Sequence, residues 1–475
     1  VRTYRHNGSS WVLDAQVALT HDVLGNLTTV SHPSGIGTTT IGYDLGGRKT
    51  SMSDPDLGSW SYAYERQSKL TRQTDGNGKT TCLYYDTLGR LLGKQYRQDM
   101  ACHVGTHHHV TYTYDQGHTA YYHTRGQLTE VNSNGYRKQL LYDFRGQLVQ
   151  ETITLYGAPQ PYTTSYSYDA YLRPVHTTYP DGEMVTVTYN GMGLPTRLRS
   201  HQFGDLVDGT TWGNSVVSNG VSYDAAGRLT QLRFPAGGNL WRTQSYWPWH
   251  DGTRNNSNGR LQAIQVGTTV GSGNRLDLLY GYDSFGNVAG MAEQADGGNT
   301  SIYHFCYDEQ NRLVRGYAPH VDGQPCAAYS TGQPYAYDAT GRLTTYEATP
   351  LTVGSVKPHL ALPTGTYGGD GNGNLTRRQG DILVWNSENQ LWIYGRPTPL
   401  LVEEYAYDPD GVRVRKRSNN IDTYYPNPLY EQTGDRITKY YYFNGQRIAM
   451  IFDGVLRYLH SDHLGSTAAV TDSSG

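Results

Sequence analysis

Short strand-like stretches run along most of the chain, and a recurring corner separates one stretch from the next. Many stretches end in two tyrosines spaced two residues apart, such as Tyr112 and Tyr114 or Tyr280 and Tyr282. A spacing of two places both rings on one face of a β-strand, where aromatic rings pack as a ladder. The sequence shows no helical periodicity of convincing length. The pattern therefore predicts an all-β chain built from serial β-hairpins.

The corner between the stretches follows the phrase aromatic-Asp-x-x-Gly-Arg-Leu. Asp at the first position of the corner and Gly at the fourth favour a type I turn. A left-handed residue after such a turn gives a three-residue hairpin loop with a bulge. Three copies carry the complete phrase, and they consist of Tyr85, Asp86, Gly89, Arg90 and Leu91, of Tyr223, Asp224, Gly227, Arg228 and Leu229, and of Tyr337, Asp338, Gly341, Arg342 and Leu343.

The left-handed position of the corner is occupied by glycine in most copies, as at Gly146 and Gly286. Asn311 and Asn389 replace it elsewhere, and Asn is the next residue that tolerates a positive φ. Leu172 stands at this position in one copy, so we expect a different turn there.

The phrase also predicts a register. Asp should lie opposite the residue after Gly, as Asp86 opposite Arg90, and the aromatic residue should lie opposite Leu on the other face, as Tyr85 opposite Leu91. Cross-strand pairs of this kind contribute about 0.2–1 kcal/mol each. A single hairpin is marginal in water, so the copies must zip together into one continuous array.

Composition favours a thin β-structure over a solid core. Of the 475 residues, 36% are hydrophobic and only 17% are charged, while Gly (56) and Tyr (42) are abundant. Ordinary globular proteins carry about 25% charged residues. A net charge of −3 without a basic stripe argues against a nucleic-acid partner. The longest apolar stretches fall well short of the roughly 18 residues that a membrane span needs. The chain starts at Val1 without Met, which suggests a piece of a longer protein.

Four cysteines form two pairs with the same spacing of twenty residues, Cys82 with Cys102 and Cys306 with Cys326. Both pairs also stand in the same setting within the repeat. We therefore predict two disulfide bonds that staple neighbouring strands, each worth about 3 kcal/mol in the chain-entropy model. Disulfides imply an oxidising compartment and hence export. The alternative is four free buried thiols; a zinc site is disfavoured because close Cys-x-x-Cys spacing is lacking.

The search for reactive residues yields no constellation that outweighs a structural role. Asp462, His463 and Ser466 are neighbours in sequence, whereas a catalytic triad takes its residues from separate elements. Gly371 and Gly373 belong to a repeat corner and not to a phosphate-binding loop. We expect no catalytic residue, no metal and no cofactor in this chain, and therefore no enzyme.

The corner phrases resemble the YD repeats of RHS (rearrangement hot spot) proteins, which also occur in teneurins and in the C components of bacterial Tc toxins. The copies run from about His21 to Phe443. The stretch from Tyr458 onward resembles the opening of the RHS-associated core domain, with Asp462, His463, Leu464, Gly465 and Ser466 at its start. The resemblance implies a repeat shell over residues 1–457 and a truncated core domain over residues 458–475.

That resemblance implies a spiralling β-sheet that closes into a large hollow shell, or forms part of one. In bacterial members the shell holds a C-terminal toxin, and an autoprotease in the core domain releases it. Such machinery would follow Gly475, so no catalytic residue is carried over. We expect a structural shell, secreted or at the surface of a bacterium, with its own C-terminal toxin as cargo. Further shell or secretion-apparatus subunits are possible partners.

Two alternatives to the toxin shell stay open at this point. Abundant aromatic side chains on an exposed sheet could stack on sugars, as in a carbohydrate-binding adhesin. The array could also be the scaffold of a teneurin-like cell-contact protein. Fold-level analogy favours the shell.

Overall fold

The structure is a computed structural model that describes residues 2–6, 11–32, 36–98, 102, 108–119, 121–208, 220–235, 238–249, 258–319, 332–338, 341–354 and 357–475. Regular structure in these ranges consists of β-strands that pair antiparallel, and it includes no helix. The prediction of an all-β chain of serial hairpins is confirmed.

The chain begins with a separate hairpin of β1 (Arg2–His6) and β2 (Trp11–Gln16). The long sheet that follows contains β3 (Ala18–His21), β4 (Leu27–Ser31), β5 (Thr38–Tyr43), β6 (Lys49–Asp54), β7 (Gly58–Tyr64), β8 (Leu70–Thr74), β9 (Thr80–Tyr85), β10 (Leu91–Arg97), β11 (Val110–Tyr114), β12 (Leu128–Ser133), β13 (Tyr136–Tyr142), β14 (Leu148–Leu155), β15 (Tyr162–Tyr168), β16 (Pro174–Thr178), β17 (Met184–Tyr189), β18 (Pro195–Ser200) and β19 (Gly204–Val207).

Two further sheets continue in the same manner. The first contains β20 (Val221–Tyr223), β21 (Leu229–Phe234), β22 (Leu240–Tyr246), β23 (Leu261–Gly267), β24 (Leu276–Tyr282), β25 (Val288–Ala295), β26 (Ser301–Tyr307), β27 (Leu313–Pro319) and β28 (Gln333–Pro334). The second contains β29 (Ala336–Tyr337), β30 (Leu343–Tyr346), β31 (Thr349–Val353) and β32 (Ala361–Pro363).

The last sheet carries the chain to its C-terminus. It contains β33 (Tyr367–Gly369), β34 (Leu375–Arg378), β35 (Asp381–Trp385), β36 (Leu391–Pro397), β37 (Leu400–Tyr407), β38 (Arg413–Ser418), β39 (Ile421–Asn427), β40 (Tyr430–Thr433), β41 (Arg436–Phe443), β42 (Gln446–Phe452), β43 (Val455–Ser461) and β44 (Thr467–Thr471). β43 runs through position 458, the predicted start of the core domain.

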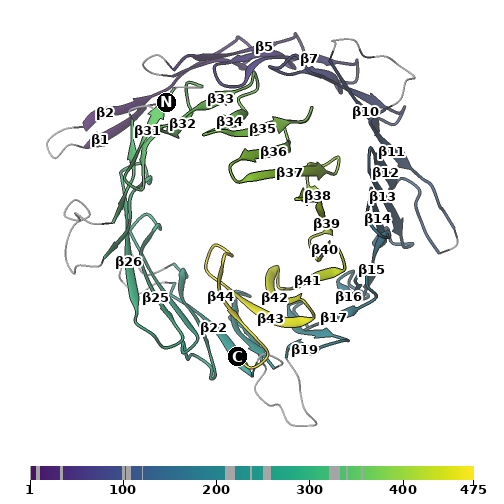
Figure 1. Ribbon diagram of the computed structural model, residues 1–475, viewed down its shortest axis with the longest axis vertical. Coiled ribbons are helices and arrows are strands. Elements are labelled where there is room, and N and C mark those ends of the chain that lie inside the picture. The colour runs from purple at the N-terminus through teal and green to yellow at the C-terminus, as the bar shows by residue number, and fades with distance from the viewer. Residues whose placement is uncertain are drawn as a thin grey trace.

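The first sheets follow one another around a ring, and the last sheet begins a second circuit inside it. Figure 1 shows this path from β5 and β7 through β14 and β19 to β26 and β32, with β33 to β44 inside the outline of the ring. We call β3 to β32 the first turn and β33 to β44 the second turn. The chain is therefore a spiral wall whose sheets do not close, as expected for part of a shell.

The two edges of the first turn differ in their connections. Because neighbouring strands are antiparallel, successive connections lie at opposite edges of the sheet. The Tyr-Asp corners, such as residues 85–91 between β9 and β10, lie at one edge, which we call the corner rim. Connections such as residues 75–79 between β8 and β9 lie at the opposite edge, the far rim. The second turn contacts the far rim, where Asn372 bonds Asp75.

The main hydrophobic cluster lies where the two turns meet. It joins Leu198, Leu206 and Phe234 of the first turn to Tyr441 and Tyr458 of the second, and all five are buried. The wall is otherwise thin, as its large exposed surface shows. The 52.9 kDa chain exposes 25392 Å². A compact globular protein of that mass would expose about 18,000 Å². Burial is thus concentrated between the turns.

The corner at Leu172 corrects one prediction. Asp169 N donates to Arg173 O at 3.0 Å and Leu172 N donates to Asp169 O at 3.1 Å, which are the bonds of an ordinary corner. Leu172 takes a φ of 65°, so the expectation of a different turn there is wrong. The backbone bonds and the Arg173–Asp169 ion pair at 2.6 Å outweigh a left-handed cost of about 1–2 kcal/mol.

We expect Leu172→Gly to raise the free energy of unfolding by up to about 1 kcal/mol, because glycine relieves the left-handed strain and loses little packing. Leu172 is 43% exposed, which keeps the lost packing small. Urea unfolding of the two proteins measures the difference. Leu172→Ala is the control, since it removes the same side chain and keeps the strain. An equal gain in both variants would contradict the strain argument.

Candidate functional site: the seam between the two turns

The predicted corner residues come together in the predicted register. In the copy at residues 223–229, Asp224 N donates to Arg228 O at 2.9 Å, and Arg228 Nε donates to Asp224 Oδ2 at 2.7 Å. Tyr223 pairs with Leu229 across the hairpin, and Gly227 has a φ of 76°. The other complete copies match, with Tyr85 opposite Leu91, Tyr337 opposite Leu343, Arg90–Asp86 and Arg342–Asp338 distances of 2.7 Å, and φ values of 83° at Gly89 and 84° at Gly341.

A second contact links many of the corners to the next, and sequence reasoning missed it. Tyr246 OH donates to Leu229 O at 3.0 Å, which joins the tyrosine of one repeat to the leucine of the repeat before it. The Arg228 guanidinium lies 4.0 Å from the centre of the same Tyr246 ring. Equivalent bonds run from Tyr85 to Leu70 O at 3.0 Å and from Tyr337 to Leu313 O at 3.1 Å. The recurring phrase therefore links neighbouring hairpins along the corner rim.

Two identical Asp-Gly-Asn-Gly connections clasp the start of the second turn to the far rim. They are residues 75–78 and 370–373, 295 residues apart in the chain. Asn77 Nδ2 donates to Asp370 Oδ2 at 3.0 Å, and Asn372 Nδ2 donates to Asp75 Oδ2 at 2.7 Å. Gly371 N donates to Asn77 Oδ1 at 2.7 Å, and Asn77 N donates to Asn372 Oδ1 at 3.1 Å. The two side-chain amide bonds are reciprocal, like those of an isologous interface within one chain.

The clasp requires glycine because the two backbones lie close together. A Cβ on Gly371 would lie 2.3 Å from Gly76 O, and a Cβ on Gly76 would lie 2.7 Å from Gly371 O. Both distances are far shorter than a carbon and an oxygen can approach. Glycine at each position therefore permits the backbone contact that the side-chain amides then fix.

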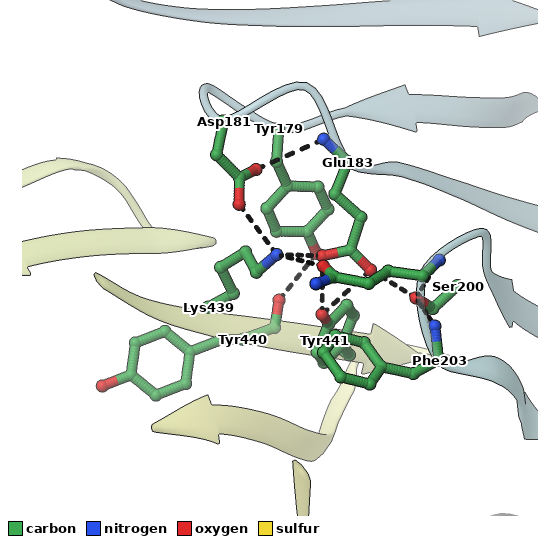
Figure 2. A network of polar contacts seen from close by, with 9 residues as sticks. Tyr179, Asp181, Glu183, Ser200, Phe203, Lys439, Tyr440 and Tyr441 are labelled. Carbon is green, nitrogen blue, oxygen red and sulfur yellow. Dashed lines mark hydrogen bonds and ion pairs between the residues drawn. The ribbon is translucent and has the colours of Figure 1, made fainter. Parts of the chain in front are cut away.

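Further along the seam, a buried ion pair holds β41 against the connection between β16 and β17 (Figure 2). Lys439 Nζ contacts Glu183, lies 2.8 Å from Asp181 Oδ2 and donates to Gln202 Oε1 at 3.2 Å. The side chains of Lys439 and Glu183 are 4% and 3% exposed. Tyr441 OH donates to Glu183 Oε2 at 2.8 Å.

In this network every N–H group of the Lys439 ammonium has an acceptor. The three acceptors around Lys439 equal the three N–H groups of an ammonium. The Ser200 hydroxyl donates to Glu183, and Tyr179 OH donates to Tyr440 O at 2.8 Å (Figure 2). Burial, and next the Glu183 carboxylate, raise the pKa of Tyr441, so the phenol keeps its proton. A buried pair of this kind costs about 3–5 kcal/mol when one partner is lost.

The seam ends in a group of buried polar residues around β43. His460 is fully buried, and its Nε2 lies 3.0 Å from Thr471 Oγ1. Its ring packs against Phe234, 5.5 Å between centres. Burial, and next the charge of Arg242, lower the pKa of His460 to about 3. Arg242 is 3% exposed, and burial lowers its pKa to about 10.

The predicted core-domain start forms another corner of the repeat type. Asp462 N donates to Ser466 O at 2.8 Å, Gly465 has a φ of 88°, and Leu464 is 78% exposed. The His463 ring lies 4.6 Å from the Tyr280 ring of the first turn. The structure thus brings Asp462 and Ser466 together as turn residues, while the assignment of a core domain stays a prediction.

The cysteine prediction is confirmed for one pair. Cys82 and Cys102 form a disulfide with a Cα–Cα distance of 5.8 Å. Cys306 is 1% exposed, and its predicted partner Cys326 lies outside the described residues. That second pairing stays a prediction.

The described residues contain no group of three or more His, Cys, Asp or Glu side chains that could hold a metal ion. Within the same ranges, no helix has the length and apolarity that a membrane crossing requires.

Comparison with known proteins identifies relatives by sequence. Residues 214–475 match the sequence model of the family described as Teneurin YD-shell. Teneurin-4 of Mus musculus is 23% identical over 499 residues, which covers 93% of this chain and 17% of teneurin-4. The tRNA3(Ser)-specific nuclease WapA of Bacillus spizizenii is 31% identical over 118 residues, or 22% of this chain and 5% of that protein.

Solved structures with the same fold come from Tc toxin complexes. The TcdB2-TccC3 crystal structure superposes with a TM-score of 0.79 at 18% identity, and it covers 100% of this chain and 27% of that chain. The Tc holotoxin pore of Photorhabdus luminescens gives a TM-score of 0.79 at 16% identity, covering 100% of this chain and 26% of that one. This chain therefore spans only a minor part of each relative.

We expect Gly371→Ala to lower the free energy of unfolding by about 2 kcal/mol, because its methyl group must push the Gly76 carbonyl away and open the clasp. Gly191→Ala is a matched control, since Gly191 holds the same corner position and has open space around its Cβ. Denaturant unfolding measures both variants. Equal stability of the two variants would show that the clasp carries no weight.

Stability should also fall with acid through His460. The folded pKa of His460 is depressed below 6.5, so the unfolded state binds a proton first as the pH falls. The contribution is complete above pH 6.5 and is lost toward pH 3 by at most about 1.4 kcal/mol per pH unit. Urea unfolding between pH 6.5 and 5 should show a flatter pH dependence in His460→Gln. Parallel curves for the two proteins would contradict this assignment.

Proposed function

The chain belongs to the teneurin YD-shell family, and from this premise we propose that it is the wall of a shell that encloses a polypeptide. Its role is structural and not enzymatic. The observation that carries the proposal is the seam, because the second turn docks along the far rim of the first through the clasp, the buried ion pair and the hydrophobic cluster. A sheet that stacks on itself in this way builds a wall taller than one strand.

The enclosed polypeptide is, in this proposal, a toxin domain that follows the wall in the same protein. Support comes from the YD-repeat resemblance and from the fold shared with the Tc toxin complexes. Further shell or delivery subunits would cover the edges that the described sheets leave open. The Cys82–Cys102 disulfide supports an oxidising location outside the cytoplasm, as in a secreted or surface-exposed protein.

A second candidate function is a teneurin-like scaffold for cell contact. It is supported by the family match over residues 214–475 and by the similarity to teneurin-4 across 93% of the chain. In that case the wall would hold appended contact domains at fixed positions and would protect no releasable cargo.

Protease protection of the complete gene product distinguishes the candidates. The enclosing wall predicts a segment outside residues 1–475 that resists protease in the native protein. Opening the seam with Gly371→Ala should make that segment cleavable, whereas Gly191→Ala should leave it protected. A complete product without any such protected segment would overturn the enclosure proposal.

A further inference from the structure

The corner at residues 407–412 lacks the arginine that the complete corners carry. At a complete corner the aspartate uses both oxygens, since Asp224 Oδ1 accepts backbone N–H groups and Oδ2 accepts Arg228 Nε at 2.7 Å. Asp408 Oδ1 accepts the amides of Asp410 at 3.0 Å and Val412 at 2.8 Å. Val412 stands where Arg228 stands, so the corner supplies no guanidinium for Asp408 Oδ2.

At some other corners an asparagine amide stands in for the arginine. Asn26 Nδ2 donates to Asp22 Oδ2 at 2.9 Å, and Asn287 Nδ2 donates to Asp283 Oδ2 at 2.8 Å. Valine has no donor. Asp408 therefore keeps one carboxylate oxygen without a side-chain donor from any described residue.

Asp408 belongs to the lining of a cavity at the seam. The cavity has a volume of about 610 Å³ and lies between β13 and β14 of the first turn and β38 to β42 of the second. That volume is typical of sites for small ligands or side chains. Tyr136, Glu151, Asp408, Asp410 and Glu431 contribute to the lining.

The cations that line the cavity have other partners. Lys138 Nζ pairs with Glu151 Oε2 at 2.9 Å. The Arg413 guanidinium lies 4.7 Å from the Tyr425 ring centre, and the Arg447 guanidinium lies 4.1 Å from the Tyr440 ring centre. Burial raises the pKa of Asp408 and the charge of Asp410 adds to that shift, while the backbone hydrogen bonds and the charge of Lys138 partly oppose it. This direction is opposite to that at Asp224, whose pKa is lowered because its hydrogen bonds and Arg228 outweigh its desolvation.

We propose that this cavity is a binding site for a guanidinium group supplied from outside the corner, with Asp408 Oδ2 as the acceptor and Asp410 as the second carboxylate. The ligand would take the place that Arg228 holds beside Asp224, where Nε and Nη2 lie 2.7 and 2.6 Å from one oxygen. Charge-assisted pairs of this geometry are the strong class of hydrogen bond. The site does not depend on enclosure of cargo, because it uses residues of the wall alone.

The test is titration of the intact chain with N-acetyl-arginine methylamide, followed by calorimetry. The neutral citrulline analogue is the control for charge, and it should bind about tenfold more weakly or not at all. Free L-arginine forms a second arm, because preference for the blocked form indicates a polypeptide source and preference for the free form indicates the amino acid. Equal binding of the citrulline analogue would overturn the proposal.

Val412→Arg provides the sharpest variant, because it places the missing guanidinium within the corner. Val412 is 59% exposed, which leaves room for the longer side chain. We expect this variant to lose binding of the arginine probe and to melt at a higher temperature than the parent, while Val412→Leu keeps binding. Asp408→Asn should also lose binding. Undiminished binding by a folded Val412→Arg protein would overturn the assignment of the site to Asp408.

Discussion

The close backbone contact between the far rim and the second turn is the constraint on which the spiral depends. A sheet of hairpins grows freely along its length, but its edges carry only turns, and turns offer little surface to bury. At the clasp, Gly76 and Gly371 allow the two Asp-Gly-Asn-Gly connections to touch through their backbones. The side-chain amides of Asn77 and Asn372 then donate to the carboxylates of Asp370 and Asp75 in the opposite connection. Further along the seam, the buried ion pair and the hydrophobic cluster hold the two turns of the spiral together.

Within each turn of the spiral, away from the seam, neighbouring hairpins are linked by the corner residues. At a complete corner the aspartate fixes the turn and orients an arginine, as Asp86 does with Arg90. The Arg90 guanidinium in turn lies 4.4 Å from the centre of the Tyr114 ring of the next repeat. The tyrosine hydroxyl then donates to the carbonyl of the residue that follows this arginine, as Tyr114 OH does to Leu91 O at 3.1 Å. Each unit thus stabilises its neighbour, which is the nearest-neighbour logic of repeat proteins. At the corner with Val412 the arginine is missing, and Asp408 loses the guanidinium donor that the complete corners have.

Local chemistry made the corners predictable, and distance in the chain hid the seam. Asp, Gly and Arg at fixed spacing determine the turn and its register within seven residues. Leu172 was mispredicted because the bonds of Asp169 and Arg173 outweigh the left-handed strain. The Lys439–Glu183 pair joins residues 256 apart, and nothing local marks either as buried. The repeated Asp-Gly-Asn-Gly sequence was the one available signal, since a second glycine beside the corner aspartate is not needed for the turn itself.

Zero-length carbodiimide cross-linking tests the docking of the two turns most directly. Lys94 Nζ of the first turn lies 3.2 Å from Glu388 Oε1 of the second, and both side chains are partly exposed. The spiral predicts an amide cross-link between these residues, 294 positions apart, in the folded protein and its loss in urea. Mass spectrometry that finds cross-links only within or between adjacent hairpins would show that the turns do not stack.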